Sequence, residues 1–272
     1  MGALIIIFIV FYFIFVLVTL WRKYLSTNIL TLEFNPHTII FKNRLRIDQA
    51  NTLSRYSSYY RMLPEKLKGH FEHRVLKFID EKDFEAKGDL NLTEDMKILI
   101  ADSAVKLTFG LRDFLYEKFE KIIIFKGEFY SDFSKTTNKG ETNPAGAIVF
   151  SWKDLLAGDE NTTDGINLGL HEFAHALMVQ NLSCEGCYEG QFLDNIGMFD
   201  DFYGNENKLS VVKTHHLFRN YGFRNKMEFF AVAIEQFFEL PEKLKTDLPE
   251  LYFILSNLLN QNPAALFSQK EA

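Results

Sequence analysis

The chain has 272 residues, of which 47% are hydrophobic and 24% charged, and its 30 Lys and Arg against 36 Asp and Glu give a formal net charge of −6 at pH 7. This length supplies material for a membrane segment and one sizeable domain. Domains that bind nucleic acids carry a basic stripe or patch. The acidic balance therefore excludes direct nucleic-acid binding from the expected functions.

The N-terminal segment is apolar. Residues 2–21 contain no charged side chain and are dominated by Ile, Phe, Val and Leu, and a helix of this length spans roughly the 30 Å of a bilayer core. Arg22 and Lys23 follow directly, as is typical of a cytoplasmic flank. We therefore expect residues 1–24 to be a single-pass anchor in the cell membrane, with the remaining chain in the cytoplasm. A cleaved signal peptide is the weaker interpretation, because no small-residue cleavage site ends the run.

The rest of the chain reads as a linker followed by one domain. We expect a juxtamembrane linker and entry segment over residues 25–62 and the domain over 63–265. Runs rich in β-branched and aromatic residues at 121–125 and 146–152 are typical of strands. Apolar residues at helical spacing predict helices over 64–80, 94–109, 165–180, 209–219, 226–239 and 248–260. The expected fold class is α+β, dominated by helices, with one small β-sheet.

A His-Glu-Phe-Ala-His motif occupies residues 171–175. Residues four apart share one face of a helix, so His171 and His175 can bind one metal ion from the same side. Zinc usually has four partners, and two histidines with one further protein ligand leave a position for water. Glu172 projects to the flank of this face, where it can act as a general base. The other interpretation is a helix that carries two surface histidines.

The residues around this motif predict a supported helix. Side chains that can cap a helix N-terminus precede it, namely Thr162, Thr163 and Asp164. Apolar residues then recur at helical spacing, at Ile166, Leu170, Phe173, Ala174 and Leu177. We expect this stripe to face a core and to hold the two histidines still.

The only two cysteines, Cys184 and Cys187, are separated by two residues in a glycine-containing loop. A structural zinc site needs four ligands, and no second cysteine pair completes the set. A redox-active pair follows a strand and opens a helix, whereas this pair lies in a loop. Free thiols, a disulfide and a metal site remain open interpretations, and a cytoplasmic location favours reduced thiols.

A third metal ligand is expected from the apolar helix at 226–239. Glu228 and Glu235 are the carboxylates in its interior, and seven residues place them two turns apart on one face. A buried carboxylate is costly unless it is paired or binds a metal. One glutamate is therefore expected to bind the metal and the other to accept a hydrogen bond from a ligand histidine. The spacing does not say which, and ordinary salt bridges at a helix edge are the alternative.

These motifs give the chain a resemblance to a known family. The resemblance is carried by Asp164–Asn167, by Asn167–His175, and by Glu228–Val232 with Glu235–Phe238, and more weakly by Ile148–Trp152. Over roughly residues 60–260 the chain resembles the Mlc titration factor A family of zinc metallopeptidases, which belongs to the gluzincin group. The resemblance implies a zincin-like fold.

The same resemblance implies roles for individual residues. His171, His175 and Glu228 would bind one zinc ion per chain, and Glu172 would be the general base. Tyr221, seven residues before Glu228, would be the phenol that stabilises the tetrahedral intermediate. Its plain alternative is a place in an aromatic surface turn.

Zinc peptidases of this architecture commonly align the substrate backbone along a sheet edge by strand addition. The strand that precedes the metal helix contains Ile148, Val149 and Phe150, and we expect these residues to bind the substrate. A simple core strand is the competing interpretation.

The expected function is therefore that of a membrane-anchored zinc peptidase that acts on peptides or proteins through a metal-activated water. The resemblance implies aminopeptidase-type activity, while nothing in the sequence separates exopeptidase from endopeptidase action. The alternative is a regulatory binding protein that sequesters a transcription factor or another partner at the membrane, as the family's name suggests.

Overall fold

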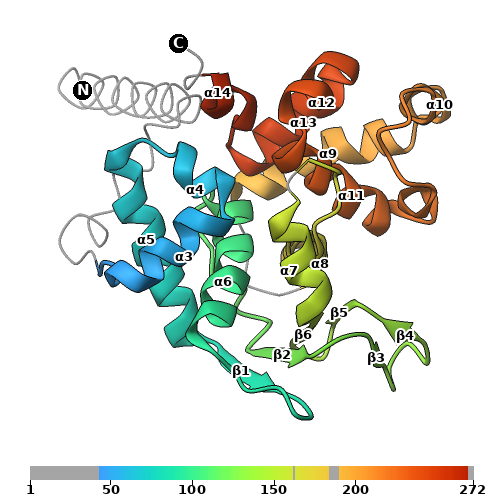
Figure 1. The fold of residues 1–272 in the computed structure, drawn as a ribbon. Coiled ribbons are helices and arrows are strands. Elements are labelled where there is room, and N and C mark those ends of the chain that lie inside the picture. Colours follow the sequence, from blue (N-terminus) through green and yellow to red (C-terminus); the bar gives the residue numbers. More distant parts are fainter. Residues whose placement is uncertain (1–42, 162, 184–189, 269–272) are drawn as a thin grey trace, which may run out of the picture. The chain divides into compact units, whose positions relative to one another are not determined.

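The computed structural model describes residues 43–161, 163–183 and 190–268 (Figure 1). The expected membrane anchor, residues 1–24, lies outside these ranges, as do Thr162 and the two cysteines. Within the described ranges, no helix combines the length and the apolar character needed to cross a membrane.

Helices make up most of the domain, which confirms the expected helix-dominated α+β class. The helices are α3 (Ile47–Tyr56), α4 (Ser58–Met62), α5 (Glu65–Glu81), α6 (Glu94–Thr108), α7 (Trp152–Glu160), α8 (Leu168–Ser183), α9 (Gly190–Tyr203), α10 (Glu206–Thr214), α11 (Lys226–Glu239), α12 (Pro241–Asp247), α13 (Pro249–Leu259) and α14 (Pro263–Ser268), with the 3-10 helix η2 (Asn220–Phe223). The strands are β1 (Asp83–Ala86), β2 (Lys121–Phe125), β3 (Phe129–Tyr130), β4 (Thr137–Asn138), β5 (Gly140–Asn143) and β6 (Ala147–Ser151).

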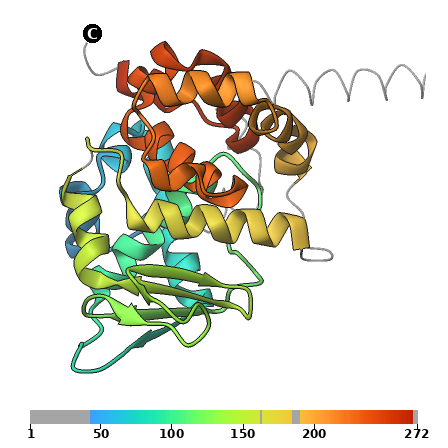
Figure 2. The same cartoon turned by 90° about the vertical axis from the view of Figure 1, so that its right-hand side faces the viewer.

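Four strands form the sheet that positions the site, in the order β1-β2-β6-β5. The first three run parallel, and β5 pairs antiparallel with β6 at one edge. A separate antiparallel pair, β3 with β4, precedes β5. In Figure 2 α8, in yellow, runs across one face of the sheet. The opposite face carries partly exposed ion pairs such as Lys121 with Asp83, so the sheet is covered by helices on one side.

The prediction that Ile148, Val149 and Phe150 lie on a substrate-binding edge is wrong. Their strand, β6, lies between β2 and β5, and both of its edges are paired. Ile148 and Phe150 are fully buried, and Val149 is 7% exposed. β6 is therefore a core strand, which is the competing interpretation that the sequence left open.

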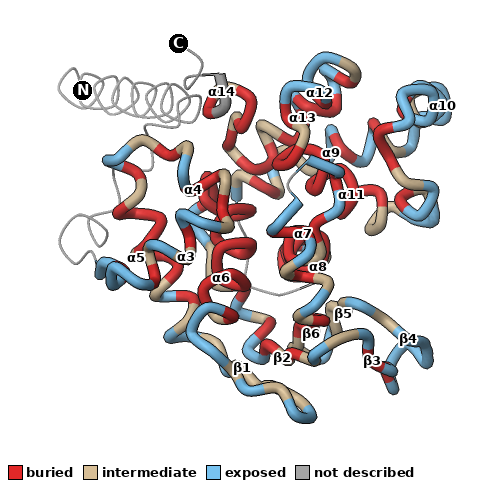
Figure 3. Tube along the Cα trace, viewed as in Figure 1, coloured by how far each residue is buried: buried red, intermediate tan, exposed pale blue. Residues whose placement is uncertain are grey.

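The core is concentrated on α6, α8 and α11, which are mostly buried in Figure 3. The ring of Phe173, on α8, lies 5.7 Å from Phe78, 5.1 Å from Tyr116 and 5.6 Å from Phe150 between centroids. All four rings are buried. Because Phe173 fixes one side of α8 against α5 and β6, the neighbouring His171 is turned toward α11.

The folded unit begins earlier than the expected domain start at residue 63. The described residues from Asn43 onward belong to one compact unit, and α3 packs on α6. Tyr59 and Tyr60 of α4 are buried, and the Tyr59 hydroxyl donates to Gln261 Oε1 at 2.6 Å. The second half of the expected linker is therefore part of the domain.

Helix ends follow local capping chemistry. Thr93 accepts a hydrogen bond from Met96 N at the start of α6, and Asn225 accepts one from Glu228 N at the start of α11. The helix expected at 209–219 instead ends at Thr214, and His216 has a positive φ of 53°. A left-handed residue interrupts a helix, which explains this early end.

Candidate metal centre

Asn167 begins the helix that carries the histidines. Its Oδ1 accepts a hydrogen bond from Leu170 N at 2.9 Å, and its Nδ2 donates to the buried Asp159 Oδ1 at 3.4 Å. The expected capping residue Asp164 is instead part of the preceding loop, where its Oδ1 accepts from Ile166 N at 3.0 Å. Because α8 starts only at Leu168, Ile166 precedes the helix and is 45% exposed rather than part of the buried stripe.

Gly165 sets the direction in which the chain enters α8. Its φ is +70°, and a Cβ at this position would collide with the Gln236 side chain. Gln236 Nε2 donates to the Gly165 carbonyl at 3.1 Å, which ties the loop to α11. Glycine is therefore required both by the left-handed backbone and by the close approach of α11.

Replacing Gly165 with Ala is expected to lower the free energy of unfolding by about 2–4 kcal/mol, because left-handed strain and the collision with Gln236 act together. Gly88 has a similar φ of +67° but no atom within 4 Å of its added Cβ, so Gly88→Ala should cost only about 1–2 kcal/mol. Urea denaturation of both metal-free variants measures the difference. Equal losses would show that the contact with Gln236 is unimportant.

The two histidines of α8 face each other across one turn. His171 Nε2 and His175 Nε2 lie 3.2 Å apart, and the two rings are perpendicular. His171 is 8% exposed and His175 is intermediate in burial. Two ring nitrogens on one side of a helix form half of a metal-binding set.

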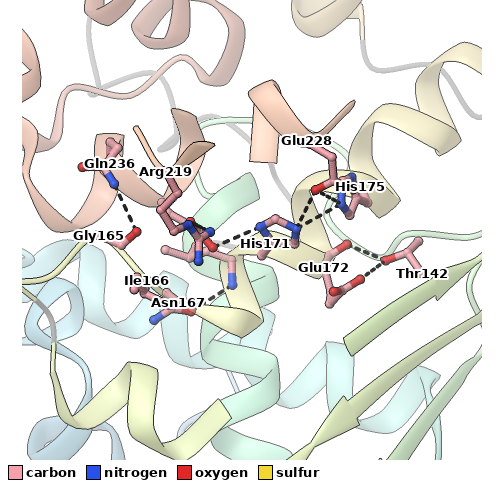
Figure 4. Close-up of polar contacts among 12 residues, drawn as sticks. Thr142, Gly165, Ile166, Asn167, His171, Glu172, His175, Arg219, Glu228 and Gln236 are labelled. Atoms are coloured by element: carbon pink, nitrogen blue, oxygen red, sulfur yellow. Dashed lines mark hydrogen bonds and ion pairs between the residues drawn. The ribbon is translucent and has the colours of Figure 1, made fainter. Parts of the chain in front are cut away.

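Glu228 completes a three-residue group from the first turn of α11 (Figure 4). Its Oε2 lies 3.2 Å from His171 Nε2 and 3.5 Å from His175 Nε2. Donors at zinc-ligand distances of about 2.0–2.1 Å in a tetrahedral arrangement lie roughly 3.3–3.4 Å apart. The three donor atoms therefore fit zinc, and within the described ranges they are the group of this kind that could hold a metal ion.

Glu235 holds the other ring nitrogen of His171. Its Oε1 lies 3.0 Å from His171 Nδ1, and its Oε2 accepts from Arg219 Nη2. Glu235 is 1% exposed, so the arginine supplies the charge partner that burial demands. A proton on Nδ1 leaves the Nε2 lone pair free for a metal. The sequence did not single out Arg219, and its only signal was that a buried glutamate needs a cation.

Glu172 points toward β5 rather than α11. The Thr142 hydroxyl lies 2.9 Å from Glu172 Oε2 and 2.8 Å from the Glu172 backbone carbonyl, so its proton can serve either. A Cβ at Gly140 would collide with Glu172 Oε1, so glycine makes room for the carboxylate. Neither Thr142 nor Gly140 was predicted, because both lie about thirty residues away in a strand without an apolar pattern.

Whenever no metal is bound, the hydrogen bonds within this group favour a protonated His171. Burial alone would lower the pKa of His171, but hydrogen bonds to Glu228 and Glu235 outweigh it and raise the pKa to about 10. Burial alone would raise the pKa of Glu228, but hydrogen bonds to both histidines hold it well below its usual range. Zinc needs neutral imidazoles, so metal binding at neutral pH must displace a proton from this group. Burial raises the pKa of Glu172, although the two nearby histidines oppose the shift.

Tyr221 lies beside the group on η2. Its ring centroid is 6.1 Å from that of His171, and the residue is 40% exposed. Burial and the neighbouring Glu228 carboxylate raise the pKa of Tyr221 to about 12. The phenol therefore stays protonated at neutral pH and can donate a hydrogen bond to a bound molecule.

A His, His, Glu group on two packed helices, beside a further buried glutamate, is the arrangement of a candidate metallopeptidase. The chain belongs to the family described as glucose-regulated metallo-peptidase M90, which matches residues 33–259. The family assignment supports metal-dependent peptide hydrolysis as the class of activity and a metal ion as the cofactor.

Two relatives are similar to the chain over most of its length. The chain is 24% identical over 213 residues to an uncharacterised protein of Synechocystis sp., covering 72% of this chain and 78% of the relative. It is 23% identical over 218 residues to Mlc titration factor A of Pectobacterium atrosepticum, covering 71% and 81% respectively. The resemblance to the Mlc titration factor A family is thereby confirmed.

Proposed function

We propose that the chain is a zinc-dependent peptidase of the gluzincin type, in which His171, His175 and Glu228 bind one zinc ion. The observation that carries the proposal is the triangle of donor atoms, with sides of 3.2, 3.2 and 3.5 Å, next to a buried glutamate. Zinc, when bound, supplies Lewis acidity that polarises a peptide carbonyl and acidifies water.

The protein's own groups then move the protons. Glu172 accepts the proton of the attacking water and returns it to the leaving amine, as a general acid–base of this position can. Thr142 holds the carboxylate through one oxygen and leaves the other for the proton transfer. The Tyr221 hydroxyl donates to the oxyanion that develops on the carbonyl, a contribution of about 3–4 kcal/mol where such donors have been removed.

The substrate backbone is proposed to lie along β5. Ser151 N donates to Lys139 O at 2.6 Å, which makes these two residues a hydrogen-bonded pair. Hydrogen-bonded and non-hydrogen-bonded pairs alternate in an antiparallel ladder. In this register, Gly140 and Thr142 therefore form non-hydrogen-bonded pairs with β6. Their backbone N–H and C=O groups therefore point away from β6, toward the free edge and beside Glu172, where an extended peptide can add as a strand.

Membrane anchorage and a cytoplasmic domain are further parts of the proposal. They are supported by the uncharged run of residues 2–21 followed by Arg22 and Lys23. Digestion of the domain by a protease added outside intact cells would contradict this orientation. Aminopeptidase-type action is proposed from the family resemblance alone.

A second function, capture of a regulatory protein partner such as a transcription factor at the membrane, is supported by the relative named Mlc titration factor A. Capture and hydrolysis are compatible, because the first needs a surface and the second needs the metal centre. A variant that lacks only the general base should lose hydrolysis and keep partner capture, which distinguishes the two functions.

Metal removal tests the peptidase proposal directly. The full chain in detergent is expected to contain one zinc per chain and to hydrolyse members of a broad peptide library. Chelation should abolish the hydrolysis, and stoichiometric zinc should restore it, because no other group acidifies water in this centre. Zinc analysis and peptide turnover before and after chelation are the measurements. Hydrolysis that survives complete zinc removal would refute the proposal.

A further inference from the structure

The rim of the metal centre is formed by η2. Tyr221, the second residue of this short helix, lies 6.1 Å from His171 between ring centroids. Gly222 is buried, and its neighbour across the interface is Val232 of α11. Because α11 also carries Glu228, η2 and the metal-binding group are held by one helix, and Arg219 and Arg224, which flank η2, are placed beside the centre.

Two cations lie on the aromatic rings of this rim. The Arg224 guanidinium carbon is 4.5 Å from the centroid of the Tyr221 ring, and Lys213 Nζ is 5.1 Å from that of Phe223. Both basic residues are exposed. Within the described part of the chain, neither of them forms an ion pair with a carboxylate.

The two other cations close to this rim are each paired with a carboxylate. Arg219 is bound to Glu235, and Lys226 Nζ lies 3.0 Å from Asp200 Oδ1. These two charges are paired with carboxylates of the same chain, whereas Arg224 has no carboxylate partner among the described residues. The whole chain carries a net charge of −6, so an anionic molecule is attracted at this rim more than over most of the surface.

Stacking on a ring fixes a guanidinium without using its hydrogen-bond donors. The ring face attracts the cation through its quadrupole, and the planar fork of Arg remains available for a carboxylate with two parallel hydrogen bonds. Arg224 is therefore held in place and still able to bind an anionic group.

We propose that Arg224, assisted by Lys213, makes the centre select substrates that present a carboxylate at the η2 rim. The inference rests on the proposed peptidase function and specifies its substrate class. An acidic side chain near the scissile bond and the C-terminal carboxylate of a short peptide can both supply the group.

Matched peptides test the proposal on the zinc-loaded full chain in detergent. One series exchanges Glu for Gln at single positions around the scissile bond, and the other exchanges a free C-terminus for an amide. The carboxylate member of at least one pair should have a kcat/KM about threefold to fivefold higher, the range of an exposed ion pair. The preference should disappear in Arg224→Gln, persist in part in Arg224→Lys, and weaken with added salt.

Arg55→Gln is the matched control. Arg55 is also exposed and stacks on a ring, with its guanidinium carbon 5.1 Å from the Tyr56 centroid, but it belongs to α3. This variant should keep the full preference. The series that shows the effect identifies the source of the carboxylate, either the side chain or the terminus.

Two results would overturn the inference. One is the absence of any carboxylate preference in the unaltered chain, and the other is an equal loss of kcat for both members of every pair in Arg224→Gln, which would mean that Arg224 only supports the Tyr221 ring. If no peptide is hydrolysed, the proposed function fails separately. Equilibrium binding of the same peptides to zinc-loaded Glu172→Gln then still decides whether Arg224 selects carboxylates.

Discussion

Replacing Glu172 with Gln is expected to lower kcat for peptide hydrolysis by about two to four orders of magnitude, the usual contribution of a positioned general acid–base. Zinc content should remain at one per chain, because Glu172 is not among the three residues that form the metal-binding group. A carboxamide has nearly the shape of a carboxylate but cannot take up the proton of the attacking water.

The surroundings of Glu172 make this substitution a clean test. The Thr142 hydroxyl, 2.9 Å from Oε2, can donate to the amide oxygen of Gln as it does to the carboxylate. The space left by Gly140 accommodates either side chain. The variant should therefore fold normally and lose only the proton transfer.

Turnover, zinc content and partner capture should be measured on the same preparation. Glu94→Gln serves as the control for a Glu-to-Gln change, since Glu94 forms an exposed pair with Lys97 on α6 at 2.9 Å. It should leave turnover unchanged. Undiminished hydrolysis in Glu172→Gln would exclude the assigned general base, while retained capture of a regulatory protein without hydrolysis would support the second proposed function.

Local sequence patterns predicted the helices of the centre better than the sheet. The expected helix over 226–239 coincides with α11, because its apolar pattern is long and Asn225 provides a cap. Of the six strands in the described part of the chain, only β2 and β6 were expected. The strand β5 has the sequence Gly-Glu-Thr-Asn, which has no apolar alternation, and it is a strand because it pairs with β6 and packs on α8. Tertiary pairing, rather than intrinsic preference, decides such segments.

The residues of the site show the same contrast between contacts that a local pattern predicts and contacts that only the fold makes. His171 and His175 could be paired from the sequence because their contact is made within one helical turn. The contacts of Thr142 with Glu172 and of Arg219 with Glu235 join residues 30 and 16 positions apart, and no local periodicity encodes them. Thr142 and Arg219, which act from distant parts of the chain, are therefore the residues of this centre that only the fold reveals.

The two glutamates of α11 illustrate the limit of spacing arguments. Glu228 and Glu235 share one face, and their spacing left open which of them binds the metal, so the expectation of Glu228 rested on the family resemblance alone. The position of η2 separates them, because Arg219 precedes η2 and binds Glu235, while the ion pairs of Glu228 within the described residues are those with the two histidines. A carboxylate that is already neutralised by arginine is the poorer metal ligand and the better acceptor for His171 Nδ1.

Zinc affinity should separate these roles. Apparent binding free energies of about 10–16 kcal/mol shared among four partners amount to about 2.5–4 kcal/mol each, so Glu228→Ala should weaken zinc binding by roughly two to three orders of magnitude. Glu235→Ala removes only the acceptor that orients His171, and losses of about 10–100-fold are typical of such partners. Glu235→Gln, which keeps an oxygen for His171 Nδ1, should lose less than Glu235→Ala.

Competition with a chelator at fixed pH measures these affinities, and thermal unfolding of each metal-free variant shows whether it is folded. The assignment of the metal ligand depends on which of the two alanine variants loses more zinc affinity. If Glu235→Ala loses zinc while Glu228→Ala retains it, the ligand and the orienting residue must be exchanged. The order expected from the geometry follows from one fact: Glu228 Oε2 faces both Nε2 atoms, whereas Glu235 reaches only Nδ1 of His171, which lies on the far side of the ring from the metal-binding group.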